Sequence, residues 1–302
     1  MKALRTPEER FVGLPGWDYE PRYLDDLHGY EGLRMHYVDE GPGTAEVTFL
    51  CLHGEPTWSY LYRKMIPVFV AAGHRVLAPD FFGFGRSDKP EEDRTYTFAF
   101  HRDALKRFIE RFDLLQTCLV MQDWGGLLGL TLPMDYPQRI TRMLIMNTGL
   151  GTGRSAGPGF DAWREYNAAN PDLDVAALMK RTTPPLSDAE SQAYAAPFPD
   201  ARYKAGVRRF PELVPTRPDM PGVETGLHAM SFLSNDWCGQ TFMAIGLQDP
   251  VLGEAPMRAL QKRIRRCPEP MLVQDAGHFV QEWGEPVARS ALAHFGLEGS
   301  AS

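Results

Sequence analysis

Short apolar segments recur along the chain, and most of them are bounded by Gly, Pro, Asp or His. Segments whose apolar residues have helical spacing lie between several of them, for example residues 60–72, 98–112 and 127–136. This alternation predicts an α/β fold with a mostly parallel central sheet flanked by helices. The predicted strands are residues 33–38, 47–52, 76–78, 118–121, 143–146, 242–245 and 271–273.

The chain departs from this alternation at two places. Near its start, residues 23–27 and 33–39 flank the segment HGYEG and predict an antiparallel hairpin. From Gly149 to about Thr225 there is no buried strand pattern, only helical pieces separated by prolines. We therefore expect a helical cap domain over residues 149–225, inserted into a main domain made of residues 1–148 and 226–302.

Composition and charge narrow the classes of function. The 302 residues are 43% hydrophobic and 24% charged, and the net charge of -7 argues against a nucleic-acid partner. The N-terminal residues do not look like a secretory signal, and no apolar run reaches membrane-spanning length, so we expect a cytoplasmic protein that contacts no membrane. Cys51, Cys118, Cys238 and Cys267 are far apart and form no C-x-x-C pair, so no metal site is expected.

Asp123 stands where a buried strand ends and a helix begins, within CLVMQDWGGLLGL. Asp is a common first residue of a helix, because its oxygens accept hydrogen bonds from the free N–H groups of the first turn. The position also matches the nucleophile of the strand-to-helix turn G-x-S-x-G, with Gly125 at the second glycine and Met121 at the first. Ligands collect at this edge of an open parallel sheet, so Asp123 is a candidate nucleophile.

Two more residues complete the order nucleophile, acid, histidine. Asp249 follows the predicted strand 242–245, and His278 follows the predicted strand 271–273. Taken alone, Asp249 could initiate a turn before Pro250, and His278 could be an ordinary loop histidine. In this order after Asp123 they indicate a catalytic triad. Asp275 is nearer to His278 in sequence but would have to fold back within one short loop, so Asp249 is preferred.

A glycine loop, HGEPTW, follows the predicted strand 47–52. In this architecture the oxyanion hole consists of the backbone N–H after the nucleophile and another N–H from this loop, here those of Trp124 and Glu55. His53 is expected to be structural. Asp80 and Ser87, in the glycine-rich turn after strand 76–78, are expected to be turn-forming residues.

These motifs resemble the haloalkane dehalogenases of the α/β-hydrolase fold, through HGEPTW, DFFGFGRSDKP, VMQDWGG, GLQDPVLG and DAGHF. The resemblance covers almost the whole chain and implies an Asp-His-Asp triad with two halide-binding tryptophans, Trp124 and the cap residue Trp163. Another subgroup takes a halide donor and the triad acid from positions held here by Glu55 and Asn147. An ionised carboxylate cannot donate a hydrogen bond to a halide, and an amide cannot supply the anion, so this chain does not fit that subgroup.

The resemblance implies hydrolysis of a haloalkane to an alcohol, a halide ion and a proton. An aspartate carboxylate is anionic near neutral pH, so Asp123 can attack saturated carbon and form an alkyl ester. His278, oriented by Asp249, then activates a water that hydrolyses this ester. The implied partners are a small halogenated alkane, water and halide, with no metal or organic cofactor, and we expect a monomer.

The expected pocket is small, dry and apolar. Its walls, by resemblance, include six residues that could each equally be ordinary core: Phe160, Phe210, Pro211, Val251, Leu252 and Phe279.

Two alternatives remain open from the sequence. Epoxide hydrolases of this fold also use an Asp nucleophile, but they need acidic donors for the opening oxygen, and cap residues Tyr166, Tyr194 and Tyr203 are candidates. A non-catalytic binding protein on the same fold could lose any triad residue without harm, yet all three are present.

Overall fold

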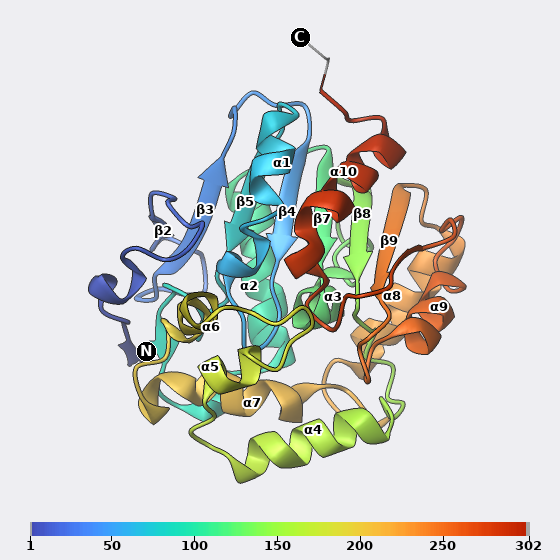
Figure 1. Cartoon of the computed structure of the whole chain (residues 1–302). Helices are drawn as coiled ribbons and strands as arrows, with labels where there is room; N and C mark the ends of the chain where they lie inside the picture. The colour runs from blue at the N-terminus through green and yellow to red at the C-terminus, as the bar shows by residue number, and fades with distance from the viewer. Residues whose placement is uncertain (1, 300–302) are drawn as a thin grey trace.

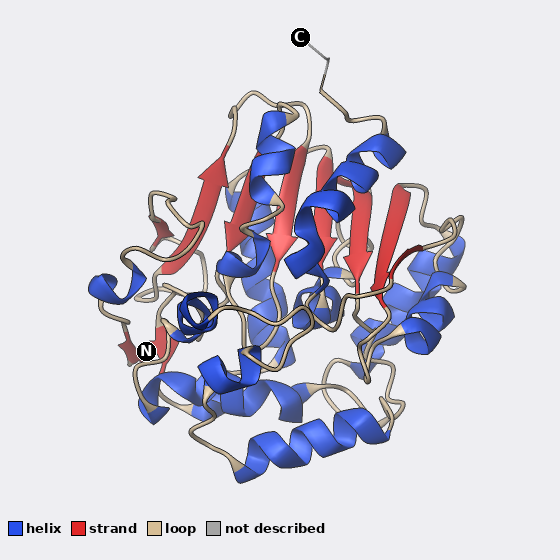
Figure 2. Ribbon diagram, in the orientation of Figure 1, coloured by secondary structure: helices blue, strands red, loops and turns tan. Residues whose placement is uncertain are grey.

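The computed structural model describes residues 2–299, which contain an eight-stranded sheet (Figures 1 and 2). The six strands from β10 to β5 run parallel, whereas β3 is antiparallel to both of its neighbours, β5 and β2. Both the mostly parallel sheet and the early hairpin predicted from the sequence are confirmed. In order across the sheet, the strands are β10 (Met271–Val273), β9 (Gln240–Gly246), β8 (Ile140–Met146), β7 (Thr117–Met121), β4 (Thr48–Leu52), β5 (Arg75–Pro79), β3 (Met35–Glu40) and β2 (Arg22–Leu24).

The central strands are apolar on both faces. Every residue of β4 and β7 is buried. A strand with one face in water would instead alternate apolar and polar residues. Helices cover both faces: in Figure 1, α1 (Ile66–Ala71) and α10 (Gly284–Phe295) lie in front of the sheet, and α2 (Phe98–Arg111) lies behind it. This burial explains why continuous apolar runs were sufficient to predict the strands.

The helix α2 shows how a covering helix is specified. Its buried residues recur at spacings of three and four, and the Thr97 side chain caps its start by accepting a hydrogen bond from the Phe100 N–H. Four shorter 3-10 helices connect the other elements of the main body: Glu8–Phe11, Ser59–Tyr62, Asp93–Thr95 and Val280–Trp283. A short antiparallel pair of β1 (Ala3–Leu4) and β6 (Lys89–Pro90) was not predicted from the sequence.

Within the described residues, the chain between β8 and β9 is helical and contains no strand. Figure 1 shows α4 to α7 beyond the carboxyl ends of β4, β7 and β8. The helix α8 begins at Val223, so residue 225, the expected end of the cap, lies inside this helix. The helices of this segment are α4 (Pro158–Ala169), α5 (Val175–Met179), α6 (Asp188–Ala195), a 3-10 helix (Ala201–Lys204), α7 (Ala205–Leu213) and α8 (Val223–Asn235), and α9 (Glu254–Gln261) follows β9.

The helix α3 (Asp123–Gly129) begins directly after β7 and lies against the carboxyl end of β4. A Cβ atom on Gly125 would come within 1.9 Å of the Leu52 carbonyl oxygen, a backbone atom that has little freedom to move. Glycine at this position therefore allows α3 to approach the sheet closely.

We expect Gly125→Ala to lower the free energy of unfolding by about 1–3 kcal/mol or more, because the added methyl group forces backbone atoms apart. Gly43→Ala is the matched control, since Gly43 is exposed and a Cβ there meets nothing within 4 Å. Urea unfolding followed by circular dichroism measures both. Equal stability of the two variants would mean that the close contact with β4 does not constrain α3.

Candidate active site

Asp123 occupies a strained turn between β7 and α3. Its φ is 50°, in the left-handed region that non-glycine residues adopt at a cost of about 1–3 kcal/mol. Two hydrogen bonds tie this turn to the end of β8: the Asp123 N–H donates to the Asn147 carbonyl (3.0 Å), and the Thr148 hydroxyl donates to the Asp123 carbonyl (2.7 Å). The neighbouring strand therefore holds the strained backbone in place.

The Asp123 carboxylate is held between two other segments. Its Oδ1 accepts a hydrogen bond from the Glu55 N–H at 2.8 Å, and its Oδ2 lies 3.4 Å from His278 Nε2. A Cβ on Gly54 would come within 2.4 Å of Oδ1, so the loop after β4 can approach only because residue 54 is glycine. The backbone N–H of Trp124 lies in the first turn of α3, where backbone donors have no partner within the helix.

His278 and Asp249 form a second close pair. His278 Nδ1 lies 2.7 Å from Asp249 Oδ2, the oxygen that also accepts from Asn147 Nδ2 at 3.0 Å. The other oxygen, Oδ1, accepts from the backbone N–H groups of Val251 (2.8 Å) and Leu252 (3.0 Å). The Asp249 carboxylate is thus almost fully buried but completely hydrogen-bonded, which fixes the imidazole with Nε2 toward Asp123.

The electrostatics follow from this geometry. Burial alone would lower the pKa of His278, but the Asp249 carboxylate and then Asp123 outweigh it and raise that pKa to about 10. Burial alone would raise the pKa of Asp249. The nearby His278 and the hydrogen bonds that the Asp249 carboxylate accepts outweigh burial and hold that pKa below its usual range. While both carboxylates are ionised, the site therefore favours an imidazolium.

Glu55 contributes a side chain as well as a backbone donor. Burial, and then the Asp123 charge, raise the pKa of its carboxyl well above the usual value, which favours the neutral form of the acid. Its Oε1 is buried and has no hydrogen-bond partner among the described residues. The resemblance had drawn attention to Glu55 only as a residue unable to donate to a halide while ionised.

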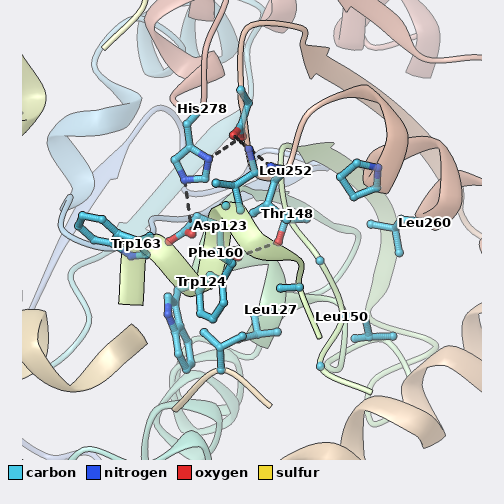
Figure 3. Close-up of a pocket in the computed structure, with 18 of the residues that line it drawn as sticks. Asp123, Trp124, Leu127, Thr148, Leu150, Phe160, Trp163, Leu252, Leu260 and His278 are labelled. Atoms are coloured by element: carbon cyan, nitrogen blue, oxygen red, sulfur yellow. Dashed lines mark hydrogen bonds and ion pairs between the residues drawn. The ribbon is translucent and has the colours of Figure 1, made fainter. Parts of the chain in front are cut away.

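A cavity of about 860 Å³ opens beside these groups (Figure 3). It is larger than the small pocket expected from the sequence, and most of its exposed lining is apolar. Both proposed oxyanion residues, the triad and both predicted halide-binding tryptophans line it. Of the six predicted walls, five line the cavity: Phe160, Pro211, Val251, Leu252 and Phe279.

Phe210 is the exception among the predicted walls. It is fully buried, and its ring packs against that of Trp124 with the centroids 4.4 Å apart. It also contacts the rings of Phe84 and His101. Phe210 therefore supports Trp124 from behind, because the buried face of α7 points toward the main body at this residue.

The two tryptophans of the cavity carry free donors. Within residues 2–299, neither the Trp124 nor the Trp163 indole N–H has a hydrogen-bond partner. By contrast, the Trp58 N–H donates to the Ala193 carbonyl (3.1 Å), and the Trp237 N–H donates to the Thr241 hydroxyl (3.0 Å). Figure 3 shows both free indoles near Asp123. Two unpaired N–H donors beside an apolar cavity suit a small anion.

The three cap tyrosines lie elsewhere. None of them is among the described residues that line the cavity. The Tyr194 hydroxyl is buried, 2.6 Å from Glu282 Oε1, to which it donates, and it accepts from Arg63. Tyr166 is exposed and Tyr203 is half-buried. These positions offer no acidic hydroxyl to an opening epoxide in this cavity.

Two polar residues of the site were not identified as functional from the sequence. Asn147 was considered only as a failed triad acid, yet its amide bonds both Asp249 and the Gly246 backbone. Gln122, between β7 and Asp123, contacts His278 and was not considered from the sequence, where the predicted strand stopped one residue earlier. A polar residue directly after a buried strand was the available signal in both cases.

The described residues contain neither a cluster of metal ligands nor a membrane-spanning helix. Among residues 2–299, no group of three or more His, Cys, Asp and Glu side chains is placed to hold a metal ion. The same part of the chain contains no helix that is both long enough and apolar enough to span a membrane.

The shifted pKa values predict how pH affects stability. The raised pKa of His278 stabilises the fold fully below the unfolded value of about 6.5, and this contribution is lost as pH rises toward 10. The depressed pKa of Asp249 stabilises the fold above about 3.9, and this contribution is lost at lower pH. We expect the stability difference between wild type and His278→Phe to be largest from about pH 4 to 6.5 and to shrink on both sides.

Urea unfolding at a series of pH values measures this difference. His28→Phe, which replaces an exposed histidine that does not line the cavity, is the control for the loss of an imidazole. A flat profile for His278→Phe would show that the pair with Asp249 is not ionised in the folded protein.

Comparisons with known proteins agree with this architecture. The family described as alpha/beta hydrolase fold matches residues 47–285. A haloalkane dehalogenase of Psychrobacter cryohalolentis is 44% identical over 96% of each chain, and one of Mycobacterium marinum is 42% identical over 95% of this chain and 97% of its own. The structure of haloalkane dehalogenase DpaA from Paraglaciecola agarilytica, described as tetrameric, superposes with a TM-score of 0.96 at 55% identity and covers 98% of this chain and 99% of that one. The chain belongs to the haloalkane dehalogenases of the α/β-hydrolase fold.

Proposed function

We propose that the chain hydrolyses the carbon–halogen bond of haloalkanes through an alkyl ester on Asp123. One observation carries this proposal: an aspartate carboxylate and two indole N–H groups without partners border the same apolar cavity. A carboxylate can displace a halide from saturated carbon, and the indoles can receive the halide. The His278–Asp249 pair stands beside the carboxylate, where a base is needed for the second step.

In the first step, one Asp123 oxygen attacks the carbon that bears the halogen. A carbon–oxygen bond forms while the carbon–halogen bond breaks, and the halide leaves with the electron pair. Because the Glu55 N–H holds Oδ1, Oδ2 is the oxygen free to attack. The N–H groups of Trp124 and Trp163 stabilise the developing halide, each by about 1.5–3 kcal/mol, since hydrogen bonds to a charged group are stronger than neutral ones.

In the second step, water hydrolyses the ester. His278 Nε2 takes a proton from the water while the water oxygen attacks the Asp123 carboxyl carbon, and Asp249 stabilises the imidazolium. The negative charge moves onto an Asp123 oxygen, near the N–H groups of Glu55 and Trp124. When the intermediate collapses, the carbon–oxygen bond to the alkyl group's oxygen breaks and the His278 imidazolium protonates that oxygen, so the alcohol leaves. The Asp123 carboxylic acid that remains gives up its proton to solvent, which restores the carboxylate.

Esterification also changes the base. The free site has two carboxylates beside His278, and these raise its pKa to about 10, so that the imidazole would hold a proton at neutral pH. Forming the ester neutralises Asp123 and removes one of those two charges. The pKa of His278 must then fall, and the imidazole becomes a stronger candidate for general base at the stage that requires one.

Every residue in this proposal comes from one chain, so the activity as drawn needs no second subunit, and we propose a monomer. The relative DpaA is tetrameric in its structure. Light scattering coupled to size-exclusion chromatography distinguishes a 34.0 kDa monomer from a larger assembly.

We expect purified protein to release bromide from short 1-bromoalkanes and to form no diol from styrene oxide. The reason is that the cavity offers indole donors to a halide but no tyrosine hydroxyl to an epoxide oxygen. Ion chromatography measures bromide, and gas chromatography measures diol. Diol formation without bromide release would replace this proposal with epoxide hydrolysis.

The covalent intermediate can be trapped. We expect His278→Phe to release about one bromide per active site and to accumulate the alkyl ester on Asp123, because the base of the second step is missing. Asp123→Ala should give neither an adduct nor turnover. Peptide mass spectrometry locates the adduct, and an adduct on any other residue would show that the nucleophile is misassigned.

Removing either indole donor should weaken halide binding. We expect Trp163→Phe and Trp124→Phe to raise the inhibition constant of bromide about 10- to 100-fold, the equivalent of one hydrogen bond to a charged group. Trp283→Phe is the matched control, because its N–H also lacks a partner among the described residues but does not line the cavity. If all three variants bound bromide equally well, the halide site would lie elsewhere.

A further inference from the structure

Gln122 directs its side chain at the proposed base. The residue is fully buried between β7 and α3, and its Nε2 lies 2.9 Å from His278 Nε2 and 3.1 Å from the His278 carbonyl oxygen. Gln122 stands at the position that precedes α3, yet its side chain makes no hydrogen bond to the first turn. Both N–H bonds of the amide are therefore directed to one residue, His278.

The surroundings determine which way the amide points. With its nitrogen toward His278, the amide donates to the His278 carbonyl. With the two ends exchanged, the Gln122 oxygen would face that carbonyl oxygen, and two acceptors would be in contact. In the orientation of the structure, Gln122 Oε1 is buried without a partner among the described residues, which is a cost that the contacts with His278 must offset.

This orientation has a consequence for the proton on His278. The amide can donate to Nε2 only when Nε2 carries a lone pair, that is, when the imidazole is neutral with its proton on Nδ1. An imidazolium would direct an N–H at another N–H donor. The groups that favour the cation are the carboxylates of Asp249, after β9, and Asp123, on α3, whereas Glu55, after β4, is buried where its neutral form is favoured.

We propose that Gln122 is a positioning residue for ester hydrolysis: its amide disfavours the imidazolium form of His278, so that the base is neutral once Asp123 is esterified. This inference rests on the proposed function. In the free site the carboxylates of Asp249 and Asp123 together favour the imidazolium form of His278 more strongly than the Gln122 amide disfavours it. After esterification only the Asp249 carboxylate opposes the amide, and the amide then shifts His278 toward the neutral imidazole. Because Nε2 has one lone pair, the amide N–H gives way to the attacking water as that water transfers its proton.

Single-turnover kinetics over a range of pH separate the two steps. The bromide burst reports alkylation, and decay of the alkyl-enzyme mass reports hydrolysis. In Gln122→Met, which keeps the length of the side chain but not the donor, we expect the acidic limb of the hydrolysis profile to rise by about half to one pH unit, with hydrolysis below that limb slower by about 3- to 10-fold. Alkylation should stay within about twofold of wild type, because His278 takes no proton in that step.

Gln281→Met is the matched control. Gln281 is also fully buried with its Oε1 lacking a partner among the described residues, but its amide nitrogen donates to the Tyr62 hydroxyl at 3.5 Å and not to His278. We expect its acidic limb to match that of wild type. Gln122→Asn, which withdraws the same amide from the ring, should shift the limb in the same direction as Gln122→Met and decides the question if the methionine variant does not fold.

An unmoved acidic limb in a folded Gln122 variant would overturn the inference, as would equal slowing of both steps with no pH shift. In either case the wild-type bromide burst would still support the proposed function. Absence of a bromide burst in the wild type would contradict the proposed function, and with it this inference.

Discussion

The site depends on one backbone constraint, the left-handed turn at Asp123. A φ of 50° points the carboxylate out of the sheet edge, between the loop after β4 and the segment that carries His278. The strain is sustained because the Asp123 N–H and carbonyl both bond to residues at the end of β8. Close packing of α3 against β4 prevents the turn from relaxing, since the groups around Gly54 and Gly125 leave no free space. Rigid elements thus position the proposed nucleophile to within the accuracy that a displacement reaction needs.

The same edge of the sheet organises the base. Asn147 directly follows β8, and Gly246 is the last residue of β9. The Asn147 side-chain amide donates to the Gly246 carbonyl and to the Asp249 carboxylate, and it accepts from the Gly246 N–H. Asp249 is therefore fixed by the register of two neighbouring strands and by the backbone of the loop that follows. Asn147, which is unsuited to be a triad acid, thus holds the proposed triad acid, Asp249, in place. The cap is joined to this region by Arg63, which bonds Glu190 on α6 and Glu282, four residues after His278.

The meeting of the three proposed catalytic residues at one edge of the sheet could be predicted, because it depends on topology alone. Parallel strands end at the same edge of the sheet, so Asp123, Asp249 and His278, each directly after a strand, could be brought together without knowledge of side-chain contacts. The contacts of Asn147 and Gln122 could not be predicted, because they join residues 99 to 156 positions apart and depend on strand order and rotamer. Phe210 was predicted to be a cavity wall but packs behind Trp124. The sequence could not distinguish the two, since apolar residues of a cap helix can face either the cavity or the core. The volume of the cavity depends on how the cap sits on the sheet, and no local pattern encodes that.

The charges around His278 explain why a carboxylate nucleophile and a histidine base can share one site. An imidazole flanked by two carboxylates has a raised pKa and stays protonated, so it cannot accept a proton from water. With a serine nucleophile the site would hold only the Asp249 charge, and the base would be needed before the first step rather than after it. With aspartate, the first step needs no base and itself removes the charge that keeps the imidazole protonated. The proton affinity of His278 is then left to two neighbours that act in opposite directions, the Asp249 carboxylate at Nδ1 and the Gln122 amide at Nε2. In the proposed mechanism the substrate therefore sets the protonation state of the base through the bond that it forms.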